Sequence, residues 1–303
     1  MKNVKADAPS EPGSKGATGW GRRQALVALL PLLLGVPMAQ AQTEMTDLAK
    51  VRASGVLKVA VYKDNAPFAE GPVTDIKGLD VALAGALAQA MNLKLSLLPF
   101  DADENMDDDL RNMVWKGHYL GYGPADVMLQ VPVDKTLMDN NPQVVMVGPY
   151  MRQTFVLMHD TNSIAQVARP EDLKGLALAA ERGTGAASAM MGYGGGMMRN
   201  QVTIFNTGIQ AAQAVIDGKA AAAYLTRAQA EAAMFRAGVK PGRYALSTLA
   251  LTGIPNKGWP VGMAVKKSNR ELGQAIENAL KSLRDSGELL KIFQQQGMTL
   301  TAP

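Results

Sequence analysis

The 303-residue chain contains no cysteine. It can therefore form neither a disulfide nor a thiolate metal site, and no cysteine is present to carry a lipid. Histidine is almost as scarce, with only His118 and His159, and aromatic residues make up 5% of the chain. No Ser-His-Asp arrangement is legible, and carboxylate pairs cannot be inferred from sequence separation. We therefore predict no catalytic residues, no enzyme activity, and no metal or cofactor site.

The apolar run at 25–38 is too short to span a membrane. It has 14 residues, whereas a membrane-spanning helix needs about 20. Five basic residues precede it, and the small-x-small pattern of Ala39, Gln40 and Ala41 follows it, which is typical of a secretory signal. We expect 1–41 to be a signal peptide cleaved near Ala41, giving an exported protein without membrane insertion. Because Arg22 and Arg23 are adjacent, the twin-arginine and the general secretion routes both stay open.

Without 1–41, the chain also lacks an excess of charge of either sign. The whole chain has 31 basic and 27 acidic residues, of which 1–41 holds 5 and 2, so 26 and 25 remain. A nearly neutral surface gives no reason to expect nucleic acid as a partner. The 262 residues that follow Ala41 are enough for one large domain or for two lobes, and we expect a monomer.

The start of the processed chain has the pattern of a βαβ unit. A strand at 55–62 is followed by a helix at 79–91, with apolar positions every three to four residues, and by a strand at 94–98. This order predicts an α/β fold with a parallel sheet and a right-handed crossover. Strands at 126–131 and 143–148 lead to Pro149, Tyr150 and Thr154, where we expect the chain to cross to a second lobe. The second lobe is predicted from strands at 154–159, 175–180, 202–205 and 220–225 and a helix at 208–216.

Ligands of parallel sheets bind at the carboxyl ends of the strands. The loops at 64–68, 100–101 and 130–134 should therefore share one edge of the first sheet. In the second lobe, Gly183, Thr184 and Gly185 follow a strand and precede a helix-forming segment. Glycines allow close approach of a ligand, and a helix N-terminus offers free N–H groups to an anion, but an ordinary turn has the same pattern.

Two further segments allow more than one interpretation. In the insert 103–124, Asp107 to Asp109 favour a helix start, with Leu110, Met113 and Val114 as its buried face, or alternatively a hard-cation site. Its aromatic residues suit a wall over a cleft, a docking surface for a protein, or core packing; they are Trp115, His118, Tyr119 and Tyr122. The methionines around 192–196 suit Cu(I) ligation or packing onto a glycine loop.

The order of several short motifs resembles the periplasmic solute-binding proteins of the amino-acid type (family 3). The motifs are Gly55-x-Leu57-x-Val59, Ala66-Pro67-Phe68, Gly78-Leu79-Asp80-Val81, Ala125-Asp126-Val127, Pro149-Tyr150, Asp172-Leu173-Lys174-Gly175, Arg182-Gly183-Thr184, Gly218-Lys219 and Gly262-Met263-Ala264-Val265. The resemblance implies a type II fold in which each lobe is a mainly parallel sheet flanked by helices. Lobe 1 would comprise 42–150 plus 260–303 and lobe 2 would comprise 151–259, joined by a two-strand hinge. It also implies that a small solute is captured in the inter-lobe cleft for an ABC-type importer.

Three departures from this family concern the ligand. No arginine occurs between Asp126 and Tyr150, where a guanidinium usually grips the carboxylate of an amino acid. Thr226 stands where the family has an acidic residue for the amino group, and a hydroxyl cannot neutralise an ammonium. Asn65 replaces an aromatic residue. We therefore do not expect a standard α-amino acid as the ligand.

The segment from Asp109 to Leu129 resembles the subgroup associated with quinoprotein (PQQ) alcohol dehydrogenases, which implies an alternative role as a periplasmic accessory protein of such a dehydrogenase. For a ligand in the cleft, we predict contacts from nine residues: Asn65, Phe68, Asp101, Gln130, Tyr150, Thr154, Arg182, Thr184 and Thr226. Arg182 would supply a displaced cation for an acidic ligand, or it is an ordinary surface arginine.

Overall fold

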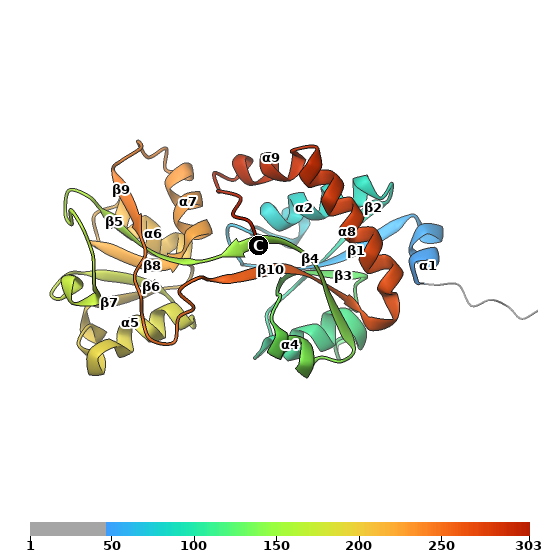
Figure 1. Ribbon diagram of the computed structural model, residues 1–303, viewed down its shortest axis with the longest axis horizontal. Helices are drawn as coiled ribbons and strands as arrows, with labels where there is room; N and C mark the ends of the chain where they lie inside the picture. Colours follow the sequence, from blue (N-terminus) through green and yellow to red (C-terminus); the bar gives the residue numbers. More distant parts are fainter. Residues whose placement is uncertain (1–46) are drawn as a thin grey trace, which may run out of the picture. The chain divides into compact units, whose positions relative to one another are not determined.

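The computed structural model describes residues 47–303, so the predicted signal peptide lies outside the described residues. In this part of the chain, ten strands form two five-stranded sheets (Figure 1). The order in the first sheet is β2 (Lys94–Phe100), β1 (Val56–Tyr62), β3 (Val127–Pro132), β10 (Trp259–Lys266), β4 (Val144–Gln153). The order in the second is β7 (Val202–Phe205), β6 (Leu178–Glu181), β8 (Ala222–Thr226), β5 (Phe155–Asp160), β9 (Tyr244–Ser247).

Each sheet contains four parallel strands and one strand that runs against them. In the first sheet, β1 is parallel to β2 and β3, whereas β10 is antiparallel to β3 and β4. In the second, β6 is parallel to β7 and β8, whereas β5 is antiparallel to β8 and β9. The prediction of an α/β fold with mainly parallel sheets is confirmed.

The helices on one face of the first sheet come from both ends of the described chain. They are α1 (Asp47–Ser54), α2 (Leu79–Ala90), α8 (Arg270–Asp285) and α9 (Glu288–Gln295). One apolar cluster joins them to the strands, because Leu83 of α2, Ile276 of α8 and Phe293 of α9 pack with Leu57 and Val59 of β1. The return of the last helices to the first sheet, which the family resemblance implied, is therefore present.

The insert 103–124 covers the other face of the first sheet. It forms α3 (Met106–Leu110), which Asn105 caps by accepting a hydrogen bond from the Asp108 amide, and a π-helical turn at Arg111–Trp115. Leu110, Met113 and Val114 are buried against Met128 of β3, as predicted. The short α4 (Lys135–Asn140) also lies on this side, since the Asn141 side chain that ends it donates to Asp107.

The second sheet carries α5 (Gly185–Gly196), α6 (Gly208–Ile216) and α7 (Arg227–Arg236). Small residues allow close packing of α6, whose alanines at 211, 212 and 214 are buried with Val215 in one cluster. Of the methionines around the glycine segment, Met190 and Met198 are completely buried in another cluster on this sheet, whereas Met197 is 41% exposed.

The chain passes between the sheets twice, from β4 into β5 at Thr154 and from β9 back to β10. Trp259, the first residue of β10, pairs with Gln153, the last residue of β4. Because β1, β2 and β3 run parallel to β4, their carboxyl ends point the same way as Gln153. In the second sheet Phe155, the first residue of β5, pairs with Thr226, the last residue of β8. The carboxyl edges of both sheets therefore lie at the crossing.

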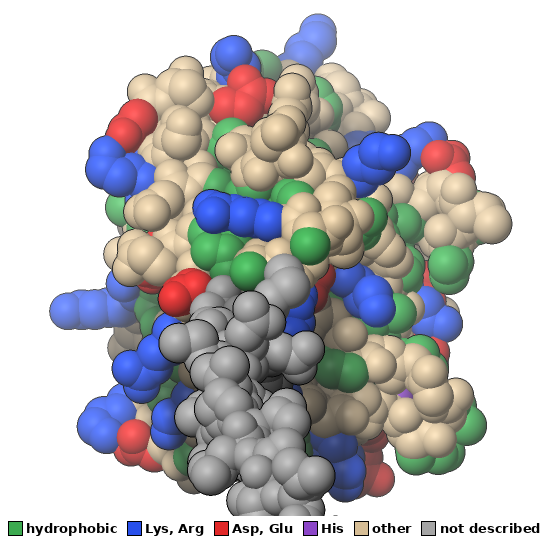
Figure 2. Space-filling model, turned by 90° about the vertical axis from the view of Figure 1, so that its right-hand side faces the viewer, with side chains coloured by type: hydrophobic (Ala, Val, Ile, Leu, Met, Phe, Trp, Pro, Cys, Tyr) green, Lys and Arg blue, Asp and Glu red, His purple; other side chains and the backbone are tan. Residues whose placement is uncertain are grey.

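None of the helices formed by residues 47–303 is long and apolar enough to cross a membrane. On the face shown in Figure 2, Lys and Arg side chains stand at separate positions among acidic, hydrophobic and other residues. This distribution fits the nearly neutral charge of the chain that follows 1–41.

Candidate functional site

The loop after β1 holds Asn65 and Phe68 in a tight turn. The carbonyl of Asn65 accepts hydrogen bonds from the amides of Phe68 and Ala69. The Phe68 ring is 2% exposed and packs into the core, whereas the Asn65 side chain is half-buried. Asp101, after β2, is exposed and forms an ion pair of 2.9 Å with Lys63. Of these three predicted ligand residues, Asn65 and Asp101 leave side-chain surface for a solute, and Phe68 mainly shapes the loop.

Three of the nine predicted residues meet at a residue that sequence reasoning did not select. Oδ1 of Asp80, in the first turn of α2, accepts hydrogen bonds from the Tyr150 hydroxyl and from Nε2 of Gln130, both at 3.2 Å. The Asp80 amide donates to the carbonyl of Phe68 at 2.9 Å. Asp80 therefore connects the β1 loop, the end of β3 and the crossing strand β4.

Asp80 lies in an unusual electrostatic environment. It is 0% exposed, and its second oxygen, Oδ2, has no hydrogen-bond partner among the described residues. Burial is the main cause that raises the pKa of Asp80 to about 7, while the bonds from Gln130 and Tyr150 act in the opposite direction. Burial likewise raises the pKa of the Tyr150 hydroxyl well above its usual value. Gln130 has a left-handed backbone with φ of 61°, so its position is set by the fold and not by local preference.

An aromatic cluster lies beside Thr154 at the crossing. The Phe155 ring is 5.4 Å from the Trp259 ring and 5.7 Å from the Tyr224 ring, measured between centroids. Phe155 and Trp259 are half-buried, whereas Tyr224 is buried and donates to the Leu249 carbonyl. Trp259 is the first residue of β10. Phe155 and Trp259 thus offer apolar surface at the carboxyl edge of the second sheet.

Thr226, the last residue of β8, caps the N-terminus of α7 and is 8% exposed. Its hydroxyl accepts from the Gln229 amide, and the Gln229 side chain accepts from the Thr226 amide, which is a capping box. Nε2 of Gln229 also donates to Glu181 at 2.8 Å, and burial raises the pKa of Glu181. The Thr226 hydroxyl therefore already has a structural partner.

The glycine loop at 182–185 leads directly into a helix, as predicted. The Thr184 hydroxyl caps α5 by accepting from the Ala187 amide, and it donates to the Glu181 carbonyl. Arg182 is exposed, and no carboxylate of residues 47–303 forms an ion pair with it. This edge of the second sheet thus offers the guanidinium of Arg182 beside helix starts that are capped by threonine hydroxyls.

Taken together, the two edges present amide, hydroxyl, carboxylate and guanidinium groups beside the aromatic rings of Phe155 and Trp259. Such groups can hold a polar or charged solute with an apolar part. In residues 47–303 no three His, Cys, Asp or Glu side chains come together as metal ligands would. None of the contacts described above joins a predicted ligand residue of one sheet directly to one of the other. The assignment of all nine residues to a single ligand site therefore stays a prediction.

The chain resembles known proteins in its structure. No family model matches the sequence, and a search of curated proteins finds no relative. Many solved structures match the fold, among them that of a polar amino acid ABC uptake transporter substrate-binding protein from Streptococcus thermophilus. Its TM-score is 0.63 at 17% identity, over 87% of this chain and 94% of that one. The chain has the two-lobe periplasmic-binding-protein fold.

Two further structures share the periplasmic-binding-protein fold. An amino acid ABC transporter substrate-binding protein from Streptococcus pneumoniae, bound to L-arginine, matches with a TM-score of 0.58 and 18% identity over 85% of this chain and 100% of that one. An ancestral amino-acid-binding protein, described as a precursor of cyclohexadienyl dehydratase, matches with a TM-score of 0.56 and 19% identity over 84% and 100%. At these identities the likeness concerns the fold alone.

Proposed function

We propose that the chain is an extracytoplasmic binding protein of the amino-acid (family 3) type, which captures a small solute between its lobes for an ABC-type importer. The observation that carries this proposal is that the carboxyl edges of both sheets lie at the β4–β10 crossing. In such folds a solute that contacts both lobes favours their closure. Lobe 1 then comprises 42–150 plus 260–303 and lobe 2 comprises 151–259. The protein is exported to the periplasm and acts there as a monomer in this proposal.

The solute is a small polar or acidic organic molecule and not a standard α-amino acid. Thr226, which replaces the expected carboxylate, uses its hydroxyl to cap α7 and cannot neutralise an ammonium. Arg182 is available to pair with a carboxylate of the solute. Changing Arg182 to Ala should weaken binding of an acidic solute at least tenfold, because a charge-assisted pair is lost; unaltered affinity would make Arg182 a plain surface residue.

A second candidate function rests on the tip of the insert. Tyr119 is 87% exposed and Leu120 is 68% exposed, and the ring of His118 stacks on Tyr122 with centroids 4.3 Å apart. Exposed aromatic and apolar side chains favour contact with a protein. This observation supports the alternative role as an accessory protein of a periplasmic quinoprotein alcohol dehydrogenase.

The two functions are distinguished by one screen. The protein purified after export is tested for thermal stabilisation by amino acids, organic acids, alcohols, polyamines and metal ions. A solute far above its Kd should stabilise the fold by about 3 kcal/mol. A clear hit supports solute capture and gives the ligand class. If no compound stabilises the protein while a purified quinoprotein dehydrogenase binds it, and Tyr119→Ala abolishes that binding, the accessory role is supported instead.

A further inference from the structure

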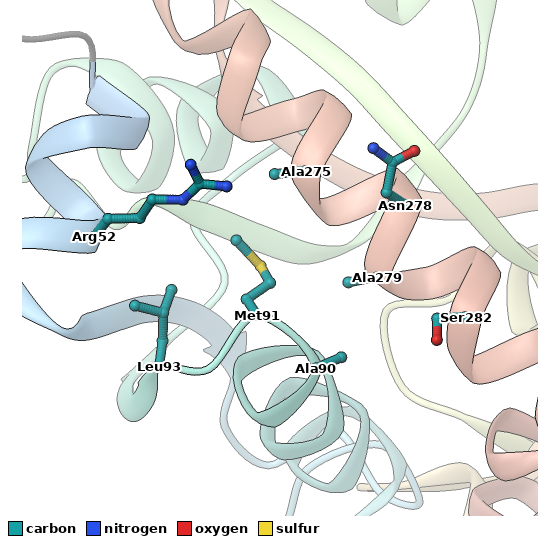
Figure 3. A pocket seen from close by; sticks show the side chains of 8 residues that line it. All are labelled: Arg52, Ala90, Met91, Leu93, Ala275, Asn278, Ala279 and Ser282. Atoms are coloured by element: carbon teal, nitrogen blue, oxygen red, sulfur yellow. The ribbon is translucent and has the colours of Figure 1, made fainter.

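A cavity of about 320 Å³ lies among α1, α8 and the turn between α2 and β2 (Figure 3). Leu93, in its lining, directly precedes Lys94, and Lys94 pairs with Val56 at the amino-terminal ends of β2 and β1. The cavity therefore lies at the opposite edge of the first sheet from the crossing. None of the nine predicted ligand residues lines it, so it is independent of the proposed solute site.

One charged residue, Arg52 of α1, lines the cavity. Figure 3 shows its guanidinium extending over Met91 toward α8. No carboxylate of residues 47–303 forms an ion pair with Arg52; the nearby Asp47 pairs with Lys50 instead. The carbonyls of Leu87, Ala88 and Gln89 at the end of α2 accept hydrogen bonds from backbone amides of the turn. Arg52 is thus a cation without a described partner at a concave surface.

The rest of the lining is amphipathic. Met91 and Leu93 are half-buried and Ala279 is 7% exposed, so they form an apolar floor. On α8, Asn278 and Ser282 add polar groups. The amide oxygen of Asn278 accepts from Gln274, which leaves its NH₂ group available in the described part of the chain.

We propose that this cavity binds a small monocarboxylate that carries a hydrocarbon chain. A guanidinium makes two parallel hydrogen bonds to a carboxylate, and one Arg52 matches a single negative charge. The hydrocarbon chain covers Met91 and Leu93, and the volume is at the lower end of the range for small-ligand sites. A ligand in this position contacts α1, α2 and α8 at once and therefore holds α1 against the first lobe.

The probe for this site is hexanoate, compared with butyrate and with hexylamine, which reverses the charge. The protein purified after export is labelled with ¹³C at its methionine methyl groups, and the Met91 signal is assigned from a Met91→Leu variant. Hexanoate should shift the Met91 signal in a saturable way. Butyrate should bind roughly tenfold or more weakly, since each methylene contributes about a factor of four. Hexylamine should leave the signal in place.

The deciding variant is Arg52→Gln, with Arg199→Gln as the matched control, because Arg199 is an exposed arginine on the second lobe. We expect Arg52→Gln to weaken hexanoate binding at least tenfold without changing the melting temperature, and Arg199→Gln to leave binding unchanged. A Met91 signal that does not respond to hexanoate overturns the proposal. Equal affinity of the wild-type protein and Arg52→Gln for hexanoate overturns it as well. This holds whether or not hexanoate also binds at the proposed solute site between the sheets.

Discussion

Asp80 links the core of the first lobe to the crossing strand β4. Its carboxyl group is buried, bonded to Gln130 and Tyr150 through one oxygen, and unpartnered at the other. Because burial disfavours the charged form, the folded protein holds a proton on Asp80 at a pH where the unfolded chain has lost it. Folding is therefore linked to proton uptake at this position.

This linkage predicts a defined pH dependence of stability. The pKa of Asp80 is raised from 3.8 to about 7, so its contribution to the free energy of unfolding is present below pH 4, falls as the pH rises toward 7, and is constant above 7. The stability of the wild-type protein relative to Asp80→Asn should fall by up to about 1.4 kcal/mol per pH unit in that window. Urea unfolding at pH 5, 6 and 7 measures the difference.

The control for this prediction is Asp139→Asn, which removes an exposed carboxylate on α4. It should follow the wild-type pH profile. If Asp80→Asn also follows that profile, the carboxyl group of Asp80 is not the source of the dependence.

At the start of helix α7, the Thr226 side chain has a predicted functional role and an observed structural role. Thr226 is predicted to contact the ligand because it stands where the resembled family has an acidic residue. Thr226 and Gln229 also form a Ser/Thr-x-x-Glu/Gln capping pattern, and that signal could have revealed α7. Removing the hydroxyl with Thr226→Val should cost about 1 kcal/mol of unfolding free energy, whereas Thr226→Ser keeps the cap.

The same pair of variants tests the ligand assignment. If Thr226 contacts the solute, Thr226→Val lowers the affinity measured by calorimetry and Thr226→Ser restores it. Unchanged affinity in Thr226→Val would reduce this hydroxyl to a helix cap.

The second crossing depends on Gly258. Its φ is 64°, and a Cβ atom there would collide with the carbonyl oxygen of Gln153 on the adjacent strand. Gly258→Ala should therefore cost about 3 kcal/mol, through backbone strain and displacement of β10. Gly253 also has a positive φ, 84°, but no atom lies within 4 Å of a Cβ placed there. Gly253→Ala should therefore lower the free energy of unfolding by only about 1 kcal/mol. Equal losses in chemical unfolding would show that the close approach to Gln153 does not matter.

The sequence predicted most strands because hydrophobic runs and glycine boundaries are local signals. The predicted strand at 202–205 and helix at 208–216 coincide with β7 and α6. The site was less predictable, because a position after a strand does not determine where a side chain points. Tyr150 is completely buried toward Asp80, a partner 70 residues earlier in the chain, and Phe155 and Trp259 meet only once β5 and β10 are placed.

At the scale of the whole molecule, both sheets have the same arrangement of four parallel strands and one opposed strand, and their carboxyl edges converge on the crossing. The two parts of the chain contact each other through apolar and polar groups: Ala232 of α7 is buried in the apolar cluster of the first sheet, and Ala228 packs against that cluster. Arg236 of α7 pairs with Glu70, and the Thr299 amide donates to Glu231 at 2.7 Å. An exposed ion pair such as Arg236–Glu70 contributes at most about 1 kcal/mol, so a solute that contacts both lobes can add substantially to what holds them together.

Hydrogen–deuterium exchange with and without a solute found in the thermal screen tests the central claim most directly. We predict protection at 64–68 and 130–133 in the first lobe and at 181–185 and 225–228 in the second, in the same experiment, because one solute contacts both carboxyl edges. Protection confined to one lobe, or to the cavity beside Arg52, would contradict capture of the solute between the lobes.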